Sequence, residues 1–303
     1  MASVVLDSAV WFLTFKCNMA CRYCYEVVAQ EMGDSKYAKT PWDPTPDRYL
    51  AAWNKLKPRI LDLTGGEVTL LSYWLELFEK LDPAIKLGWT TNLSHEMTHF
   101  VEKIDPKRFI NITCSFHPSQ NGTLKQPMNP DLFLGRVLLL KNRGFPVCVN
   151  FVMWPEQMWL VDKYKKMFED YGIRFHIDAY SSISYYPFKF TDKENQFIQK
   201  YLGKDRAPDP LALKYGQNYQ VMCSGGQTHL SVQPDGTAWR CVLEYQMQIN
   251  KVGNIFEPGF ELLPAELPCN EHFRCPGCDR DKVKVKFVKE IDRKAEGLEV
   301  IPE

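Results

Sequence analysis

The chain has 303 residues, 45% of them hydrophobic, which is long and apolar enough for one large domain and a smaller one. Its 37 basic and 37 acidic side chains cancel, so no net positive charge favours nucleic acid or an anionic membrane as a partner. The sequence has no apolar run of membrane-spanning length and no signal-peptide pattern, and we therefore expect a cytoplasmic protein whose ten cysteines serve metal binding or catalysis.

A buried strand is predicted near the start of the chain, with three cysteines directly after it. Residues 10–15 form the apolar run of such a strand. Cys17, Cys21 and Cys24 follow in a Cys-x3-Cys-x2-Cys pattern, which lets one loop hold one face of a four-iron cluster and leaves one iron open. A structural zinc site is the alternative, but zinc normally takes a fourth protein ligand and no nearby His or Cys supplies it.

Strands and helices then alternate as far as residue 178. The further predicted strands are residues 59–63, 85–90, 109–115, 146–153 and 173–178, and the predicted helices are residues 45–57, 68–81, 94–104, 131–142 and 156–171. Six strands that alternate with helices predict an α/β fold with a parallel sheet, a partial (β/α)6 barrel over residues 1–180. In such folds the functional site lies at the C-terminal ends of the strands.

The cysteine motif and the tripeptide Gly65-Gly66-Glu67 after the second strand together resemble the radical S-adenosylmethionine (radical SAM) superfamily, over residues 10–178. The resemblance implies a [4Fe–4S] cluster whose open iron is chelated by the amino and carboxylate groups of S-adenosylmethionine. Reductive cleavage of that cofactor yields methionine and a 5′-deoxyadenosyl radical. The resemblance also implies that Gly65, Gly66 and Glu67 hold the methionine amino group, the glycines through close backbone approach and Glu67 as an acceptor.

Four further residues match softer features of the family. Tyr23 stands where the family often places an aromatic side chain near adenine. Asn92, Ser115 and Asn150 lie on or after the third, fourth and fifth strands, where they suit polar contacts to ribose or carboxylate. The alternative for each is an ordinary polar residue that satisfies local backbone groups.

Strand parity extends the prediction, because alternate residues of a barrel strand point inward. If Asn150 faces the cofactor, Cys148 faces the interior too. Ser115 and His117 share a face, so Cys114 should point outward to the helices as a buried, inert thiol.

The sixth strand and the segment after it contribute less. His176 and Asp178 share a face that could line a substrate pocket, although a histidine satisfied within the core is the alternative. Residues 181–220 are predicted to be a connector with a short helix. Residues 229–241 then predict a hairpin that turns on Asp235-Gly236.

The hairpin lies in a predicted second domain, residues 221–303, which is rich in cysteine. Its cysteines are Cys223, Cys241, Cys269, Cys275 and Cys278. The spacing alone suits a four-cysteine zinc site as well as an iron–sulfur cluster. It looks like the twitch extension of radical SAM enzymes, a shortened SPASM domain, and this likeness implies one auxiliary [4Fe–4S] cluster. The best match uses all but Cys269, which is either a thiol beside the cluster or a replacement for one of the four ligands.

The predicted reaction is hydrogen abstraction from a small polar, sugar-like substrate, followed by oxidation or epimerisation. Peptide-modifying relatives often carry a module before the first cysteines, and Cys17 comes too early to leave room for one. Oxidation would pass an electron to the auxiliary cluster, whereas epimerisation needs a thiol donor, for which Cys148 and Cys269 are candidates. An external donor such as flavodoxin or ferredoxin would supply the first electron.

Two other functions remain open from the sequence. One is a radical SAM enzyme that modifies a leaderless or separately delivered peptide. The other is a non-enzymatic iron–sulfur or zinc protein, against which Gly65-Gly66-Glu67 argues, because an electron carrier needs no contact with an amino acid.

Overall fold

The computed structural model describes residues 5–24, 45–119, 128–179, 190–202, 219–269, 283–292 and 294–296. Cys275 and Cys278 lie outside the described residues, as does most of the predicted connector.

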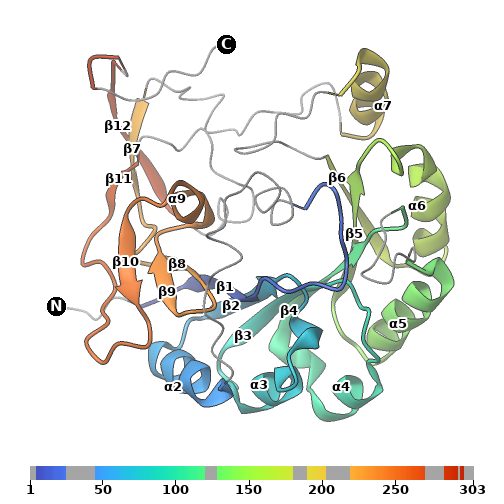
Figure 1. The fold of residues 1–303 in the computed structure, drawn as a ribbon, viewed down its shortest axis with the longest axis horizontal. Helices are drawn as coiled ribbons and strands as arrows, with labels where there is room; N and C mark the ends of the chain where they lie inside the picture. The colour runs from blue at the N-terminus through green and yellow to red at the C-terminus, as the bar shows by residue number, and fades with distance from the viewer. Residues whose placement is uncertain are drawn as a thin grey trace.

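Six parallel strands form the centre of the protein. They are β1 (Ser8–Thr14), β2 (Ile60–Gly65), β3 (Lys86–Thr91), β4 (Phe109–Phe116), β5 (Val147–Met153) and β6 (Arg174–Ala179). Each strand pairs in parallel with the next along the chain. The sheet curves, and helices cover its convex side (Figure 1). The predicted α/β partial barrel is therefore confirmed.

Helices connect these strands, with some boundaries that differ from those predicted. They are α2 (Pro46–Leu56), α3 (Trp74–Lys80), α4 (Thr98–Lys103), α5 (Pro130–Asn142) and α6 (Val161–Glu169), and α7 (Asp192–Leu202) lies in the predicted connector. The helix predicted over residues 68–81 is interrupted, because the Glu67 side chain accepts the Thr69 N–H and holds a short 3-10 turn, η1 (Val68–Leu70). Leu71 then has extended backbone, so α3 begins only at Trp74.

Two other predicted helices also begin late. The one predicted over residues 156–171 consists of a 3-10 turn, η3 (Met158–Leu160), followed by α6. The one predicted over residues 94–104 begins at Thr98, because the side chain of Asn92 accepts the Ser94 N–H and Leu93 has a positive φ of 51°. Both differences lie at the C-terminal end of a strand, where loop contacts replace the first helical turn.

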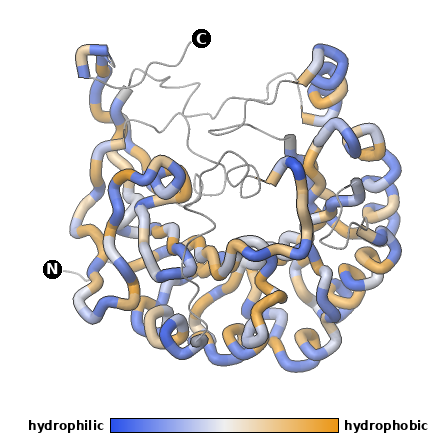
Figure 2. The backbone as a smooth tube through the Cα atoms, viewed as in Figure 1, coloured by the Kyte–Doolittle hydropathy of each residue, from blue (hydrophilic) through white to orange (hydrophobic). Residues whose placement is uncertain are grey.

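The main core lies between the convex face of the sheet and the helices. Alternate residues of β5 point into it, namely Val149, Phe151 and Met153. Aromatic rings fill the space between β3 and the helices α3 and α4. There Phe78, Trp89 and Phe100 contact one another at centroid distances of 5.1–5.6 Å. Along the backbone, apolar stretches alternate with polar ones in the strands and helices (Figure 2). The opposite residues of the strands therefore remain on the concave face, where the site is expected.

The predicted hairpin is present, and it joins the same sheet. Its strands are β8 (His229–Val232) and β9 (Thr237–Trp239), which pair antiparallel, and β10 (Lys251–Asn254) follows beside β9. β8 pairs in parallel with β1, and the Ser8 hydroxyl lies 2.8 Å from Nδ1 of His229. The sheet thus has nine strands in the order β10-β9-β8-β1-β2-β3-β4-β5-β6 and continues past the domain boundary predicted at residue 221.

A second, three-stranded sheet is formed by the remaining C-terminal strands. β7 (Tyr219–Cys223) lies between β11 (Leu267–Cys269) and β12 (Val285–Glu290), with both neighbours antiparallel to it. The short helix α9 (Val242–Met247) packs Val242 against Val10 and Phe12, so β1 is covered on both faces. Among the described residues, every helix is too short or too polar to cross a membrane.

Candidate functional site

The tripeptide Gly65-Gly66-Glu67 brings the end of β2 against the chain that leaves β1. Gly66 donates its N–H to the carbonyl of Thr14 at 2.6 Å, and Glu67 donates its N–H to the carbonyl of Lys16 at 2.8 Å. A Cβ on Gly65 would lie 2.2 Å from the Thr14 carbonyl oxygen, and one on Gly66 would lie 2.1 Å from that of Lys16. Glycine is therefore required here for an approach between two backbones of the protein, which fixes the chain one residue before Cys17.

Glu67 is fully buried, and protein donors engage both of its carboxylate oxygens. Oε1 accepts the backbone N–H and the hydroxyl of Thr69 and the hydroxyl of Thr91, at 2.8–3.0 Å. Oε2 accepts the backbone N–H of Asn92 at 2.6 Å. Burial raises the pKa of this carboxyl, whereas the four donors favour the ionised form. Glu67 therefore holds the start of the turn after β2 and the segment after β3 together, which makes it a positioning residue. Its predicted contact with the methionine amino group remains a prediction.

Asn92 connects that carboxylate to the cysteine loop. Its side-chain amide donates to Oδ1 of Asn18 at 2.8 Å and lies 3.8 Å from Sγ of Cys17. Its own oxygen accepts the Ser94 N–H, and only 5% of the residue is exposed. The predicted contact of Asn92 with the cofactor remains a prediction, and the structure uses its polar atoms to hold the loop that carries Cys17.

The rest of the cysteine loop packs on the concave face beside β5. Cys21 and Tyr23 are buried against Trp154, together with Val152, Cys24 and Met19. The Cys24 N–H donates to the Cys21 carbonyl in a tight turn. Burial is the main cause that raises the pKa of the Cys21 thiol, and the neighbouring Cys24 and Cys17 raise it further.

Tyr23 is held by a polar network that the sequence did not predict. Its hydroxyl accepts the side-chain N–H of Gln157 at 3.1 Å and lies 2.6 Å from Nδ1 of His117. Burial lowers the pKa of His117 to about 4, so the imidazole is neutral at pH 7. The hydroxyl can then donate to Nδ1, which leaves the proton of the imidazole on Nε2. The partners lie 94 and 134 residues from Tyr23, so no local pattern indicates them.

The concave face of β4 and β5 carries the other predicted polar residues. Ser115 is in register with Asn150, and Asn150 with His176, so the three form one row across the strands. Oδ1 of Asn150 is buried and, within the described residues, has no hydrogen-bond partner. Cys148 is buried on the same face of β5, whereas Cys114 packs in the main core, as the parity argument predicted.

His176 and Asp178 lie on one face of β6, as predicted. The His176 Nε2 atom is 3.5 Å from the Asp178 carboxylate, and both side chains are more than half exposed. The hydrogen bond to Asp178 raises the pKa of His176. This pair is therefore exposed rather than satisfied within the core.

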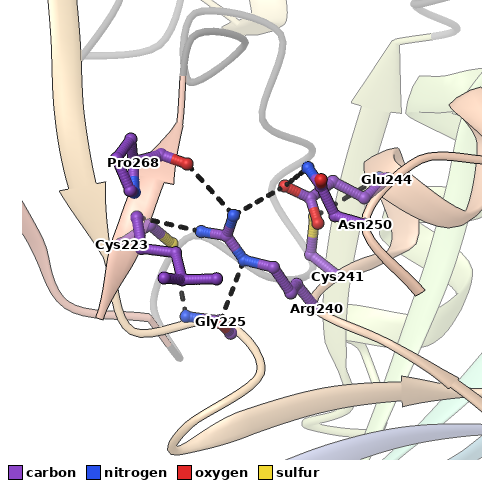
Figure 3. Close-up of polar contacts among 8 residues, drawn as sticks. Cys223, Gly225, Arg240, Cys241, Glu244, Asn250 and Pro268 are labelled. Carbon is purple, nitrogen blue, oxygen red and sulfur yellow. Dashed lines mark hydrogen bonds and ion pairs between the residues drawn. The ribbon is translucent and has the colours of Figure 1, made fainter. Parts of the chain in front are cut away.

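Two members of the second cysteine group, Cys223 and Cys241, lie on either side of the buried Arg240 (Figure 3). Cys223 ends β7, Cys241 precedes α9, and Cys269 ends β11. Burial raises the pKa of the Cys223 thiol, and the nearby Arg240 guanidinium opposes this shift. The other two predicted ligands lie outside the described residues.

Both cysteine groups contain sulfur atoms that accept backbone N–H bonds, which suits the binding of an iron–sulfur cluster. Cys17, Cys223 and Cys241 each accept a backbone N–H, with 3.4 Å between nitrogen and sulfur. A thiol sulfur is a weak acceptor, and N–H bonds of this kind suit the sulfur of a cluster-bound thiolate. Within the described ranges, no three His, Cys, Asp or Glu side chains converge closely enough to hold a single metal ion. The cluster ligands accordingly remain predictions.

Comparison with known proteins gives matches in structure alone. No family model matches the sequence, and no curated protein matches it. The structure is similar to that of SuiB from Streptococcus suis, with 16% identity and a TM-score of 0.57, over 84% of this chain and 64% of SuiB. It is similar to anSMEcpe with bound S-adenosylmethionine, with 15% identity and a TM-score of 0.59, over 82% of this chain and 78% of anSMEcpe.

A further SuiB structure contains S-adenosylmethionine, and it matches 89% of this chain and 68% of SuiB with 15% identity and a TM-score of 0.57. The fold is therefore that of the radical SAM enzymes, the family that the sequence motifs resemble. Since the identities are low, the likeness identifies the fold and leaves the reaction to be argued from the site.

Proposed function

We propose that this protein is a radical SAM enzyme in which Cys17, Cys21 and Cys24 hold a [4Fe–4S] cluster that binds S-adenosylmethionine. The observation that carries the proposal is the fixation of the cysteine loop at the C-terminal end of β1 by the close-packed Gly65-Gly66 backbone. When bound, the reduced cluster supplies the electron that cleaves S-adenosylmethionine into methionine and a 5′-deoxyadenosyl radical.

The residues around the loop have distinct tasks in this proposal. Glu67 and Asn92 hold the loop in place through the contacts described above. Asn150 presents on the concave face a buried oxygen that has no partner among the described residues, and this oxygen suits a hydroxyl or ammonium donor of a ligand. His117 presents a neutral imidazole whose Nε2–H can donate a hydrogen bond.

Anaerobic reconstitution with iron and sulfide, followed by dithionite and S-adenosylmethionine, tests the proposal. We expect 5′-deoxyadenosine from the wild type and none after joint replacement of Cys17, Cys21 and Cys24 by alanine. Cys114→Ala is the matched control, because this cysteine is buried in the main core away from the loop. Formation of 5′-deoxyadenosine by the triple variant would refute the proposal.

We also propose one auxiliary [4Fe–4S] cluster in the second cysteine group, held by Cys223, Cys241, Cys275 and Cys278. Its support is the sequence spacing together with the N–H bonds to the first two sulfur atoms. Two four-iron clusters correspond to about eight irons per chain. The triple variant of the first loop should retain about half of the iron. A wild type with zinc and about four irons would favour the zinc alternative for this group.

Two substrate classes remain proposals, a small polar molecule and a peptide. The peptide class gains support from the comparisons, because SuiB bound to precursor peptide SuiA and anSMEcpe bound to the Kp18Cys peptide are among the similar structures. A pooled library of short peptides and a pool of sugars and cyclitols can be incubated with the reconstituted enzyme. A mass change confined to one pool, absent in the triple variant, would identify the class.

The fate of the substrate radical separates oxidation from epimerisation. Epimerisation in deuterium oxide places solvent deuterium on carbon when a cysteine thiol donates the hydrogen atom. We favour oxidation, because an auxiliary cluster can accept the electron. Activity should therefore survive Cys148→Ala and Cys269→Ala without deuterium in the product. Deuterium incorporation that either substitution abolishes would establish epimerisation and identify the donor.

A further inference from the structure

Arg240 is a buried cation that contacts the segments carrying Cys223, Cys241 and Cys269. It lies between β9 and α9, and only 3% of it is exposed. Its Nε donates to the carbonyl of Gly225 at 3.1 Å, and its two terminal nitrogens donate to the carbonyls of Leu267 and Pro268 at 3.0–3.1 Å. One terminal nitrogen also lies 3.3 Å from Oε1 of Glu244 (Figure 3). The guanidinium therefore joins three separate segments of the chain.

Each of these segments carries one cysteine. Gly225 donates its N–H to the sulfur of Cys223, and Glu244 donates its N–H to the sulfur of Cys241. Cys269 directly follows Pro268 on β11. A substitution at Arg240 should therefore affect the positions of all three cysteines, even though they lie far apart in the sequence.

The strand pairing places two of these cysteines on one face. Leu267 is opposite Cys223, and Cys269 is opposite Val221. Residues opposite each other, and residues two apart on one strand, share a face of the sheet, so Cys223 and Cys269 are diagonal neighbours. The Arg240 bonds to the carbonyls of Leu267 and Pro268 hold β11 in this register.

Burial of the Arg240–Glu244 ion pair costs desolvation free energy. Charged groups lose hydration on burial, and an apolar pair of similar volume would often be as stable. Oε2 of Glu244 is buried and forms no hydrogen bond within the described residues, while Oε1 also accepts from Asn250 at 3.2 Å. The carboxylate is thus incompletely satisfied, and packing alone does not account for a charged pair next to two thiol groups.

We propose that Arg240 is the positioning residue of the second cysteine centre and that the Arg240–Glu244 pair sets the charge beside Cys223 and Cys241. The positioning part depends on the protein contacts alone. The charge part rests on the proposed auxiliary cluster, which is anionic with its four thiolates and gains one electron from dithionite on reduction. A nearby positive charge favours that reduction, and a nearby negative charge opposes it.

Alkylation of the iron-free protein tests the positioning part. Iodoacetamide labelling, followed by mass spectrometry, gives the rate for each cysteine separately. In Arg240→Gln we expect severalfold faster labelling of Cys223, Cys241 and Cys269, with no change at Cys114, which is buried in the main core. Arg240→Lys should also speed labelling, because one ammonium cannot reproduce the planar set of donors. Unchanged rates, or an equal rise at Cys114 that indicates global unfolding, would overturn the positioning role.

Redox titration tests the charge part. Replacement of Cys17, Cys21 and Cys24 by alanine leaves only the second centre, whose midpoint potential can be followed by electron paramagnetic resonance during titration with dithionite. Glu244→Gln should raise the potential and Arg240→Gln should lower it, while Glu257→Gln, at an exposed position, should leave it unchanged. A purely structural role would not give shifts of opposite sign.

Two outcomes decide against the charge role: shifts of the same sign in both variants, and a second centre that takes up no iron. Failure of the proposed enzymatic function is distinguishable from either outcome, because it would appear as absence of 5′-deoxyadenosine from the wild type. The labelling rates test the positioning role independently of the redox titration and of the 5′-deoxyadenosine assay.

Discussion

The replacement of Gly66 by alanine gives a direct test of the contact between the end of β2 and the cysteine loop. The added Cβ would lie 2.1 Å from the Lys16 carbonyl oxygen and 2.9 Å from the Phe15 carbonyl carbon, and real Cβ atoms essentially never come within 3.0 Å of another heavy atom. Both neighbours are backbone, so no side-chain rotation relieves the overlap. The two segments must therefore separate by about 1 Å.

That separation would break the bonds from Gly66 to Thr14 and from Glu67 to Lys16, which are 2.6 and 2.8 Å long. Each buried hydrogen bond contributes about 1 kcal/mol, and overpacking of this kind costs about 1–3 kcal/mol, so Gly66→Ala should lower the free energy of unfolding by about 3–5 kcal/mol.

Gly135→Ala is the matched control. This glycine is exposed on α5, and a Cβ there would have no heavy atom within 4 Å. Alanine should therefore stabilise the helix by about 1 kcal/mol. Urea denaturation of both variants measures the difference, and iron content after reconstitution reports on the cysteine loop. A Gly66→Ala protein whose free energy of unfolding lies within about 1 kcal/mol of the wild type would refute the reasoning.

Three further predictions concern side chains of the site. His117 has a pKa of about 4 in the folded protein, whereas a histidine in the unfolded chain titrates near 6.5. As the pH falls from 7 to 5, His117 therefore binds a proton in the unfolded state but not in the folded state, and the free energy of unfolding should fall by about 2 kcal/mol. Urea unfolding at both pH values should show that the free energy of unfolding falls less in His117→Asn than in the wild type. An equal fall in both proteins would contradict the prediction. Glu67→Gln should cost about 2–4 kcal/mol in the same assay, because an amide cannot accept from all four donors, and a loss below about 0.5 kcal/mol would exclude the positioning role. Asn150→Val should raise the free energy of unfolding by about 1 kcal/mol, because it removes a buried oxygen that has no partner in the described part of the chain. The same substitution should weaken S-adenosylmethionine binding measured by calorimetry, and unchanged binding would exclude a contact with the cofactor.

The sequence predicted those features that depend on short segments. Apolar runs bounded by loops identified six parallel strands in their correct order, and the Asp235-Gly236 turn identified the hairpin. Parity placed Cys114 in the main core and Cys148 on the opposite face, because side chains alternate strictly along a strand. Local patterns determine these features, and they are present in the structure.

Features that depend on distant partners were not predicted. Glu67 interrupts a helix and binds Thr91 and Asn92, which lie 24 and 25 residues further along the chain. Arg240 binds carbonyls 15, 27 and 28 residues away. A carboxylate or guanidinium satisfies its hydrogen-bonding capacity wherever the fold brings suitable groups, and no spacing in the sequence records which groups those are.

The parallel pairing of β8 with β1 has a consequence for the order of folding. Ser8 and His229 are separated by 221 positions in the chain, so their contact closes a very long loop and carries a large entropic cost. During synthesis, the strands β1 to β6 can associate while one edge of β1 still lacks its neighbour, and that open edge is a site for wrong pairing or aggregation. We therefore expect the strand that leads into Cys17 to be the last of strands β1 to β5 to acquire both neighbours, so cluster insertion should be more efficient after synthesis has passed β8 than before it.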